Sequence, residues 1–260
     1  MNSTFMIKLI FVFWLAFIPS FVLAFTRSSD SLFYYITQGN EAYSQLNNEA
    51  ALNCYLKAFK LDSLNYETTW KLSRTYAEIG VLIKGKKNRK FYFTKAANYA
   101  QKAIKINPKG PKGYLTLSIA LGRIALDTSP KERVRLSSEI KVAVDKALEL
   151  DPNDSIAWHV LGRWHRKVAT VSWIEKKIAS IFFGGIPKES SLEKAAECFQ
   201  KAIELKPDYI NNHLELGLTY EKMKEFDLAI KEYHKVLVLP VINALDQYHK
   251  TTAEDRLKKI

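Results

Sequence analysis

The residue types that most often carry catalysis or hold metal ions are sparse in this chain of 260 residues. The histidines nearest in sequence, His159 and His165, are six positions apart, which on a helix points them about 240° away from each other. The sequence contains no Cys-x-x-Cys pair, no His-Glu-x-x-His motif and no glycine-rich phosphate loop. We therefore expect no catalytic residues, no metal ion and no cofactor, and a protein that acts by binding and is not an enzyme.

The two cysteines, Cys54 and Cys198, are too few for a disulfide framework. Both fall on apolar stripes of expected helices that belong to different repeats. We therefore expect buried free thiols without a redox role.

Basic residues are in excess, with 39 lysines and arginines against 27 acidic residues and a net charge of +12. Such an excess favours acidic partners: nucleic acid, anionic lipid or acidic protein segments. Six basic residues and no acidic residue lie between positions 84 and 95. Within this run, Lys86, Lys87 and Lys90 are candidates for an electrostatic docking site, and a solvated loop followed by helix-packing aromatic residues is the alternative.

The elements that would position these residues are helices, because three segments end in the same way. Each closes on an apolar residue, a polar residue and proline, at Ile106-Asn107-Pro108, Leu150-Asp151-Pro152 and Leu205-Lys206-Pro207. An alanine stands five residues before each proline. This pattern is typical of tetratricopeptide repeats, which are helix pairs that stack on their neighbours to bury an apolar face.

We expect an all-α solenoid of about five repeats with extended or inserted helices. The helical-repeat domain would cover 25–260, with repeats at 32–65, 66–110, 111–154, 155–209 and 210–243 and a C-terminal cap at 244–260. The spacing between corresponding positions of successive repeats exceeds the usual 34 residues in three places. All the extra residues lie between the two helices of a pair. Longer or additional helices at one rim of the solenoid should result.

The inner face of such a solenoid is lined by the first helix of each pair. The positions of these first helices that face inward predict a partner-binding surface, with basic groups around partly apolar residues. Its residues are Trp70, Arg74, Lys112, His159, Arg163 and Arg166. An acidic, partly apolar peptide or a lipid headgroup with its chain would suit this lining. The alternative is that Arg74, Arg163 and Arg166 pair with acidic residues on adjoining helices.

The longest insertion carries a hydrophobic insert made of Trp173, Ile174, Ile178, Ile181 and Phe182. The last four fall at helical spacing on one stripe, with Glu175, Lys176 and Lys177 opposite. We expect this stripe to pack into the groove or onto a neighbouring helix. An exposed helix that lies on a membrane or covers a ligand is the alternative.

Residues 1–24 form a separate segment, in which Lys8 precedes an apolar run from Leu9 to Ile18. Pro19-Ser20 and then Val22-Leu23-Ala24 follow, and this order is typical of a secretory signal peptide with a cleavage site after Ala24. An uncleaved membrane anchor and a mere apolar leader are the alternatives. The protein would then be membrane-associated or exported, and a cytoplasmic, cytoskeleton-associated location remains the other possibility.

Three stretches resemble one family in particular. They are the segment from Gly162-Arg163-Trp164 through Ser172-Trp173 to Pro187, the helix Trp70-Lys71-Leu72-Ser73-Arg74-Thr75-Tyr76, and Leu237-Val238-Leu239-Pro240-Val241. Together they are similar to the regulator of microtubule dynamics family, over roughly Glu49 to the carboxyl terminus. The resemblance implies an all-helical repeat domain associated with microtubules or spindles, and some members are membrane-anchored tethers credited with binding lipid.

Two functions therefore remain open. The first is a scaffold for protein–protein interaction, whose partner would be tubulin or an acidic peptide. The second is a membrane-associated module that binds or tethers lipid or another hydrophobic ligand, with an anionic lipid or membrane as its partner. We expect the scaffold, and we expect no nucleic acid as a partner.

Overall fold

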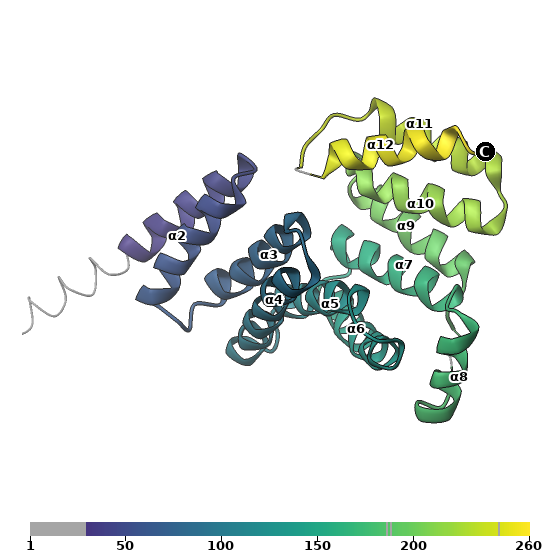
Figure 1. Ribbon diagram of the computed structural model, residues 1–260. Helices are drawn as coiled ribbons and strands as arrows, with labels where there is room; N and C mark the ends of the chain where they lie inside the picture. The colour runs from purple at the N-terminus through teal and green to yellow at the C-terminus, as the bar shows by residue number, and fades with distance from the viewer. Residues whose placement is uncertain (1–29, 186, 188, 244) are drawn as a thin grey trace, which may run out of the picture. The chain divides into compact units, whose positions relative to one another are not determined.

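A computed structural model describes residues 30–185, 187, 189–243 and 245–260, so the leader expected at 1–24 lies outside the described residues. The described chain is all-α, as expected (Figure 1). Its helices cover residues 30–44, α2 (Asn48–Leu61), α3 (Tyr66–Leu82), α4 (Lys86–Ile106), α5 (Pro111–Leu126), α6 (Pro130–Leu150), α7 (Ser155–Ala169), α8 (Trp173–Phe182), α9 (Leu192–Leu205), α10 (Ile210–Met223), α11 (Phe226–Val238) and α12 (Asp246–Leu257).

The three helix ends read from the sequence are confirmed. Helices α4, α6 and α9 end at Ile106, Leu150 and Leu205, two residues before each proline. In each case the next backbone N–H donates to the carbonyl of the expected alanine, Ala103, Ala147 or Ala202, at 2.9–3.0 Å. A proline soon after a helix end cannot continue the helix, so the stop is sharp.

The chain divides into two compact units, Met1–Thr69 and Trp70–Ile260. In the first unit, the helix at 30–44 pairs with α2, whose Tyr55 side chain is fully buried. The hydroxyl of Tyr55 donates to Asn40 Oδ1 at 2.9 Å. Asn47 caps the start of α2 by accepting the N–H of Ala50 at 3.0 Å.

The second unit stacks its helices in two layers. Helix α4 packs against α5, α6 against α5 and α7, α9 against α7 and α10, and α11 against α10 and α12. Helices α5, α7, α10 and α12 also contact one another in that order. We call the layer formed by α5, α7, α10 and α12 the inner layer. Helix α8 contacts α6 instead and extends away from α7 and α9 (Figure 1). The extra residues expected between paired helices, around 84–95 and 127–137, fall mainly in α4 and α6, which are each 21 residues long.

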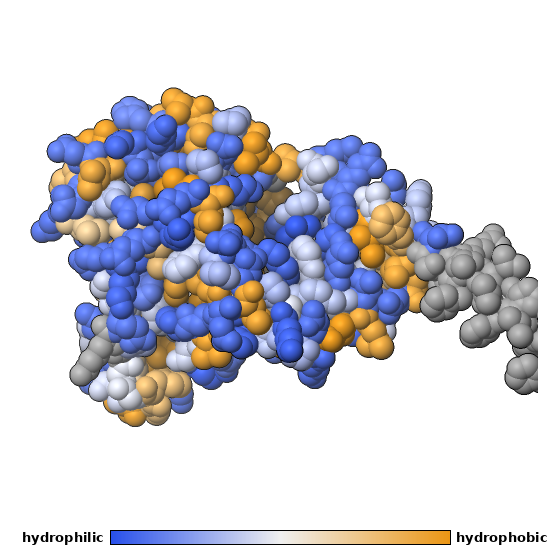
Figure 2. Space-filling model, turned by 180° about the vertical axis from the view of Figure 1, so that it is seen from behind, coloured by the Kyte–Doolittle hydropathy of each residue, from blue (hydrophilic) through white to orange (hydrophobic). Residues whose placement is uncertain are grey.

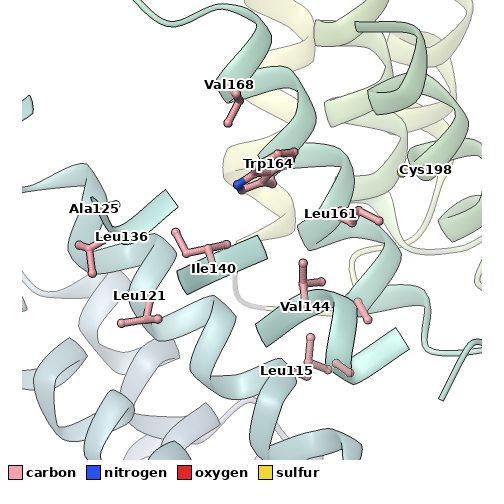
Figure 3. Close-up of a cluster of buried hydrophobic side chains, with 12 residues drawn as sticks. Leu115, Leu121, Ala125, Leu136, Ile140, Val144, Leu161, Trp164, Val168 and Cys198 are labelled. Atoms are coloured by element: carbon pink, nitrogen blue, oxygen red, sulfur yellow. The ribbon is translucent and has the colours of Figure 1, made fainter. Parts of the chain in front are cut away.

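One hydrophobic cluster joins α5, α6 and α7, and Figure 3 shows its side chains gathered between these helices. Leu121, Leu136, Val144 and Trp164 are each 7% exposed or less. The indole Nε1 of Trp164 donates to the carbonyl of Ser137 at 2.8 Å, which satisfies its polar atom inside the cluster. This packed core therefore holds α5 and α7 of the inner layer against α6.

Small residues let the paired helices approach each other closely. A Cβ atom on Gly162 would lie 2.9 Å from the ring of Phe199, and one on Gly217 would lie 2.6 Å from the ring of Tyr233. Both rings are fully buried. These contacts join α7 to α9 and α10 to α11, as the repeat pattern requires of its small and aromatic positions.

The two cysteines are free, but only one of them is buried as expected. Cys198 is 7% exposed, and burial raises the pKa of its thiol to about 12, so it stays protonated and unreactive at neutral pH. Cys54 is half-buried, and the prediction of two buried thiols was wrong at this position.

Replacing Gly162 by alanine should destabilise the second unit by about 1–3 kcal/mol, because the added methyl group collides with the buried ring of Phe199. Gly122→Ala is the matched control: it is also helical and has no atom within 4 Å of its missing Cβ. This control should stabilise the protein by roughly 0.5–1 kcal/mol through helix propensity alone. Urea denaturation of both variants tests the pair, and equal effects would contradict the packing described here.

Candidate functional site

The inner layer carries three arginines that we call the arginine cluster: Arg123 on α5 and Arg163 and Arg166 on α7. Asp154 fixes the start of α7, since its Oδ1 atom accepts the N–H groups of Ile156 at 2.9 Å and Ala157 at 3.2 Å. The register of α7 that follows from this cap turns Arg163 and Arg166 toward α10.

Glu215 of α10 serves two of these arginines. Arg166 forms a close ion pair with Glu215 Oε2 and donates to the Glu215 carbonyl at 3.2 Å, while Arg163 Nε lies 3.4 Å from Glu215 Oε1. The alternative in which these two arginines pair with acids on an adjoining helix is thereby confirmed. Arg166 is buried, whereas the side chain of Arg163 remains 29% exposed and faces solvent.

Arg123 differs from its two neighbours because it forms no hydrogen bond and no ion pair with any residue in the described ranges. It is half-buried. Burial and the nearby charge of Arg163 lower the pKa of Arg123 to about 10, so it still carries its charge at neutral pH.

His159 lies beneath the arginine cluster and is only 5% exposed. Its Nδ1 is 2.8 Å from Asn212 Oδ1 and its Nε2 is 3.4 Å from Asn211 Nδ2, an arrangement that suits a neutral imidazole. Burial, and then the charge of Arg163, lower the pKa of His159 to about 3. The prediction that His159 lines the groove was wrong, because its ring is enclosed between α7 and α10 and supports the surface from below.

The other expected inner-face residues form separate contacts. The Arg74 guanidinium stacks over the Trp70 ring, with its carbon 5.1 Å from the ring centre. Lys112 Nζ lies 2.5 Å from Asp154 Oδ2, so it links α5 to the cap of α7. Of the six residues expected at the inner face, His159, Arg163 and Arg166 come together, Trp70 and Arg74 form a pair, and Lys112 is tied up in a structural ion pair.

A cleft of about 230 Å³ lies beside Arg166, between α7, α10 and α12. Its cationic walls include exposed Lys167 and Lys222, and its apolar floor includes Leu218. Arg256 is held there by Glu221, with Arg256 Nε 2.8 Å from Glu221 Oε2. The inner layer is therefore hollowed and basic at this point.

The basic run between positions 84 and 95 covers the beginning of α4. Lys86, Lys87 and Lys90 are exposed there and form no ion pair with a described residue. Arg89 in the same turn is different, because it binds both carboxylate oxygens of Asp127 at 2.9 and 2.8 Å. We call the three exposed lysines the lysine patch.

Helix α8 is oriented differently from our prediction. It begins with a capping box, in which Ser172 and Glu175 satisfy each other's backbone N–H groups. Glu175 and Ala179 are the buried residues of this helix, and Glu175 Oε1 accepts a hydrogen bond from Arg133 of α6 at 2.8 Å. An ion pair thus fixes the side of α8 that was expected to face solvent.

The hydrophobic insert on α8 is consequently turned outward. Trp173 is 72% exposed and Ile181 is 64% exposed, while Ile174 and Phe182 are also exposed and Ile178 is half-buried. Figure 2 shows apolar surface over this helix at the lower left, beside grey atoms. The prediction that the stripe packs inward was wrong, because four of its five side chains are exposed. No helix within the described ranges is long and apolar enough to cross a membrane.

Two residues of the arginine cluster's environment were missed by the sequence reasoning, Arg123 and Glu215. Neither was among the six residues expected at the inner face. A helix presents a broad stripe of residues to its partner. A prediction that takes only a few positions of each helix therefore leaves out neighbouring residues that also reach the surface. Glu215 is an acidic residue on the first helix of the last pair, next to a helix with two expected inner-face arginines, and that charge was the signal that could have identified it.

Comparison with known proteins identifies the family. The model of the family described as regulator of microtubule dynamics protein 1-3 matches residues 35–260. This chain belongs to the regulator of microtubule dynamics family. It is similar to regulator of microtubule dynamics protein 1 of Caenorhabditis elegans, with 28% identity over 73% of this chain and 83% of that protein. It is also similar to protein 3 of the same name from Rattus norvegicus, with 31% identity over 62% of this chain and 36% of that one.

The chain thus spans most of the nematode relative but well under half of the rat relative. Among solved structures, a thermophilic TPR protein of Thermus thermophilus superposes with a TM-score of 0.63, covering 86% of this chain and 98% of that one at 17% identity. This likeness shows the tetratricopeptide-type fold.

The buried, neutral state of His159 should make stability depend on pH. Its folded pKa of about 3 lies below the unfolded value of 6.5, so only the unfolded state gains a proton as the pH falls below about 6.5. His159 should therefore cost the folded state about 2 kcal/mol between pH 7 and pH 5. Urea denaturation at both pH values should show a smaller loss for His159→Gln than for the unchanged protein. The same loss in both proteins would contradict a neutral His159.

Proposed function

We propose that this chain is a non-enzymatic scaffold that binds acidic segments of a protein partner and acts on microtubules. The lysine patch is the observation that carries the proposal. Lys86, Lys87 and Lys90 are exposed in the first two turns of α4, and none of them forms an ion pair with a described residue, although the charge of Asp127 acts on Lys86. An acidic protein segment would supply the missing negative charge.

The position of the patch strengthens this interpretation. The amino-terminal end of a helix carries a partial positive charge, so lysines in the first turns of α4 are electrostatically unfavourable without an anionic partner. The first turn of α4 contains no acidic residue, although acidic residues are preferred there. Binding of an acidic segment would offset both the repulsion between the lysines and their repulsion from the helix end.

The relatives support microtubules as the target, because they are named regulators of microtubule dynamics. Tubulin, with its acidic tails, is the partner whose charge matches the lysine patch. We further propose that four of the residues expected at the inner face, Trp70, Arg74, Arg163 and Arg166, contact the bound segment, while Lys112 and His159 position them. The division into five repeats and a cap is part of the same proposal, as is a cytoskeleton-associated location.

A second candidate function rests on α8. Trp173, Ile174, Ile181 and Phe182 form an exposed apolar face, and Lys131 Nζ lies 4.4 Å from the centre of the Phe182 ring. Exposed Lys176 and Lys177 add positive charge to the same helix. A short amphipathic helix with these features suits the surface of an anionic membrane, so a lipid-binding or tethering module is the alternative.

Reversing the charge of the lysine patch should weaken binding to microtubules. The variant Lys86→Glu, Lys87→Glu and Lys90→Glu should pellet with microtubules at least about tenfold more weakly, because three attractive contacts become repulsive. Its control carries the same charge change at exposed Lys201, Lys231 and Lys235, and it should lose much less affinity. If both variants lost affinity equally, net charge alone would drive binding and the patch would have no special role.

The alternative predicts binding of the purified chain to vesicles that contain phosphatidylserine. Replacing Trp173 and Phe182 by aspartate should abolish sedimentation with such vesicles, since both apolar side chains are mostly exposed and available to the bilayer. Vesicles of phosphatidylcholine alone are the control and should bind weakly. If the unchanged protein sediments with neither kind of vesicle, the second candidate is excluded.

A further inference from the structure

The cleft beside Arg166 is formed by the carboxyl-terminal parts of three helices of the inner layer. Its volume is about 230 Å³, and its walls belong to α7, α10 and α12. Four of the residues that line it are cationic: Arg166, Lys167, Lys222 and Arg256. Glu221 is the one acidic residue among the described residues of this lining. The cleft therefore gathers positive charge from helices that are far apart in sequence.

The two arginines of the cleft are each bound to a carboxylate. Arg166 forms its ion pair with Glu215 Oε2 and also donates to the carbonyl oxygen of Glu215 at 3.2 Å. Arg256 Nε donates to Glu221 Oε2 at 2.8 Å, and a second nitrogen of Arg256 contacts Glu221 Oε1. The charges of these two arginines are thus balanced within the protein.

Neither of these two carboxylates has an oxygen left for a further cation. The other oxygen of Glu215, Oε1, lies 3.4 Å from Arg163 Nε. Glu221 Oε2 accepts the hydroxyl of Tyr233 at 2.8 Å in addition to its bond from Arg256. Both acidic side chains are therefore fully engaged by groups of the protein.

Lys167 and Lys222 are the cations of the cleft that have no counter-charge of their own. Both are exposed, and neither forms an ion pair with a described residue. The charge of Glu175 acts on Lys167, but Glu175 Oε1 is already paired with Arg133 at 2.8 Å. Loss of contact with water, and then the charge of Arg166, lower the pKa of Lys167. An anion beside Lys167 would favour its charged form and oppose both effects.

The helix ends at the cleft offset the two lysines only in part. Helices α7, α10 and α12 all end here, and each carboxyl-terminal end carries about half an elementary negative charge. Three such partial charges are smaller than the charge of two lysines. The end carbonyls also have other donors, since the N–H of Thr170 bonds to the Arg166 carbonyl and that of Lys224 to the Glu221 carbonyl, both at 3.1 Å. The lysines are therefore not required as helix caps.

The cleft has an apolar floor as well as cationic walls. Leu218 is half-buried in this floor. The methylene groups of an aspartate or glutamate could lie on Leu218, while the carboxylate reaches the ammonium groups of the walls. A hollow with an apolar surface and a few convergent polar groups is the usual form of a binding site.

We propose that this cleft binds an acidic side chain of the partner's protein segment, with Lys167 and Lys222 as its direct contacts. The inference rests on the proposed function, because it gives the acidic segment a specific position on the inner layer. The lysine patch would attract the segment to α4. The cleft would fix where one of its carboxylates lies.

The test uses the purified chain and a fluorescein-labelled hexaglutamate peptide, followed by fluorescence anisotropy. About 0.1 M salt screens charges more than about 10 Å away, so remote lysines contribute little. The double variant Lys167→Gln and Lys222→Gln should bind the peptide about fivefold to tenfold more weakly, the loss expected for two exposed ion pairs. Both positions are exposed, and circular dichroism confirms that the variant is folded.

The matched control is Lys231→Gln with Lys235→Gln, which removes the same charge from α11. Both lysines are exposed and form no ion pair with a described residue, as at the cleft. This control should change peptide affinity less than about twofold. If the two double variants lose the same affinity, or the cleft variant binds as tightly as the unchanged chain, the inference is overturned.

Methyl signals of leucine in nuclear magnetic resonance spectra locate the bound peptide independently of the variants. The methyl groups of Leu218 should shift as hexaglutamate is added, because they form the floor of the cleft. Those of Leu136, which is 2% exposed in the cluster between α5, α6 and α7, should stay in place. Saturation with peptide without a shift at Leu218 would also overturn the inference.

The outcomes separate this inference from the proposed function. If peptide binding depends on the lysine patch and not on Lys167 and Lys222, the scaffold proposal stands and the cleft proposal fails. If the cleft variant loses peptide binding but the unchanged chain does not pellet with microtubules, the cleft proposal stands and the microtubule proposal fails. If the unchanged chain binds neither hexaglutamate nor microtubules, both are wrong.

Discussion

The close contact between a small residue on one helix and a buried aromatic ring on its partner is the constraint from which the rest of the structure follows. It recurs along the chain at Gly39 and Tyr55, Gly80 and Phe93, Gly162 and Phe199, and Gly217 and Tyr233. Each contact fixes the distance and rotation of one helix pair, because a Cβ atom in place of the glycine hydrogen would overlap the ring. In the second unit this contact fixes the pairs α3 with α4, α7 with α9 and α10 with α11, and α5, α7 and α10 contact one another in one layer.

Electrostatics of the inner layer depend on that alignment. Charged residues from α5, α7 and α10 meet there because the helices follow one another, and Glu215 becomes the counter-charge for two arginines of α7. Burial makes an unpaired charge expensive, so the two arginines of α7 depend on this one carboxylate. At α8 an ion pair has the opposite consequence for apolar residues. The ion pair between Glu175 and Arg133 holds this helix with its apolar side facing outward.

The fold was readable from the sequence because its signals are local. Helix ends at proline and small residues opposite aromatic ones occur at fixed spacings, so the all-α repeat architecture and three of its helix ends could be predicted before the structure was known. The family resemblance was equally readable from short segments around Trp164 and Trp70. The side chains at the inner layer were less predictable, because a pairing such as Arg166 with Glu215 joins residues 49 positions apart.

Helix α8 shows where periodicity alone misleads. An apolar stripe normally faces a core, and the sequence offered no sign that Arg133, 42 positions earlier, would capture Glu175 and turn the stripe outward. The prediction that the side chain of His159 lines the groove was wrong for a related reason. Its register placed it at the inner layer correctly, but only the neighbouring Asn211 and Asn212 decided that its ring would be enclosed and neutral.

The measurement that tests the central claim most directly is co-pelleting of the purified chain with microtubules before and after proteolytic removal of the acidic tubulin tails. If the chain is a scaffold that recognises acidic segments, it should bind intact microtubules in a salt-sensitive manner and lose most of that affinity when the tails are removed. Binding that is unchanged by removal of the tails, or absent with intact microtubules, would contradict this account.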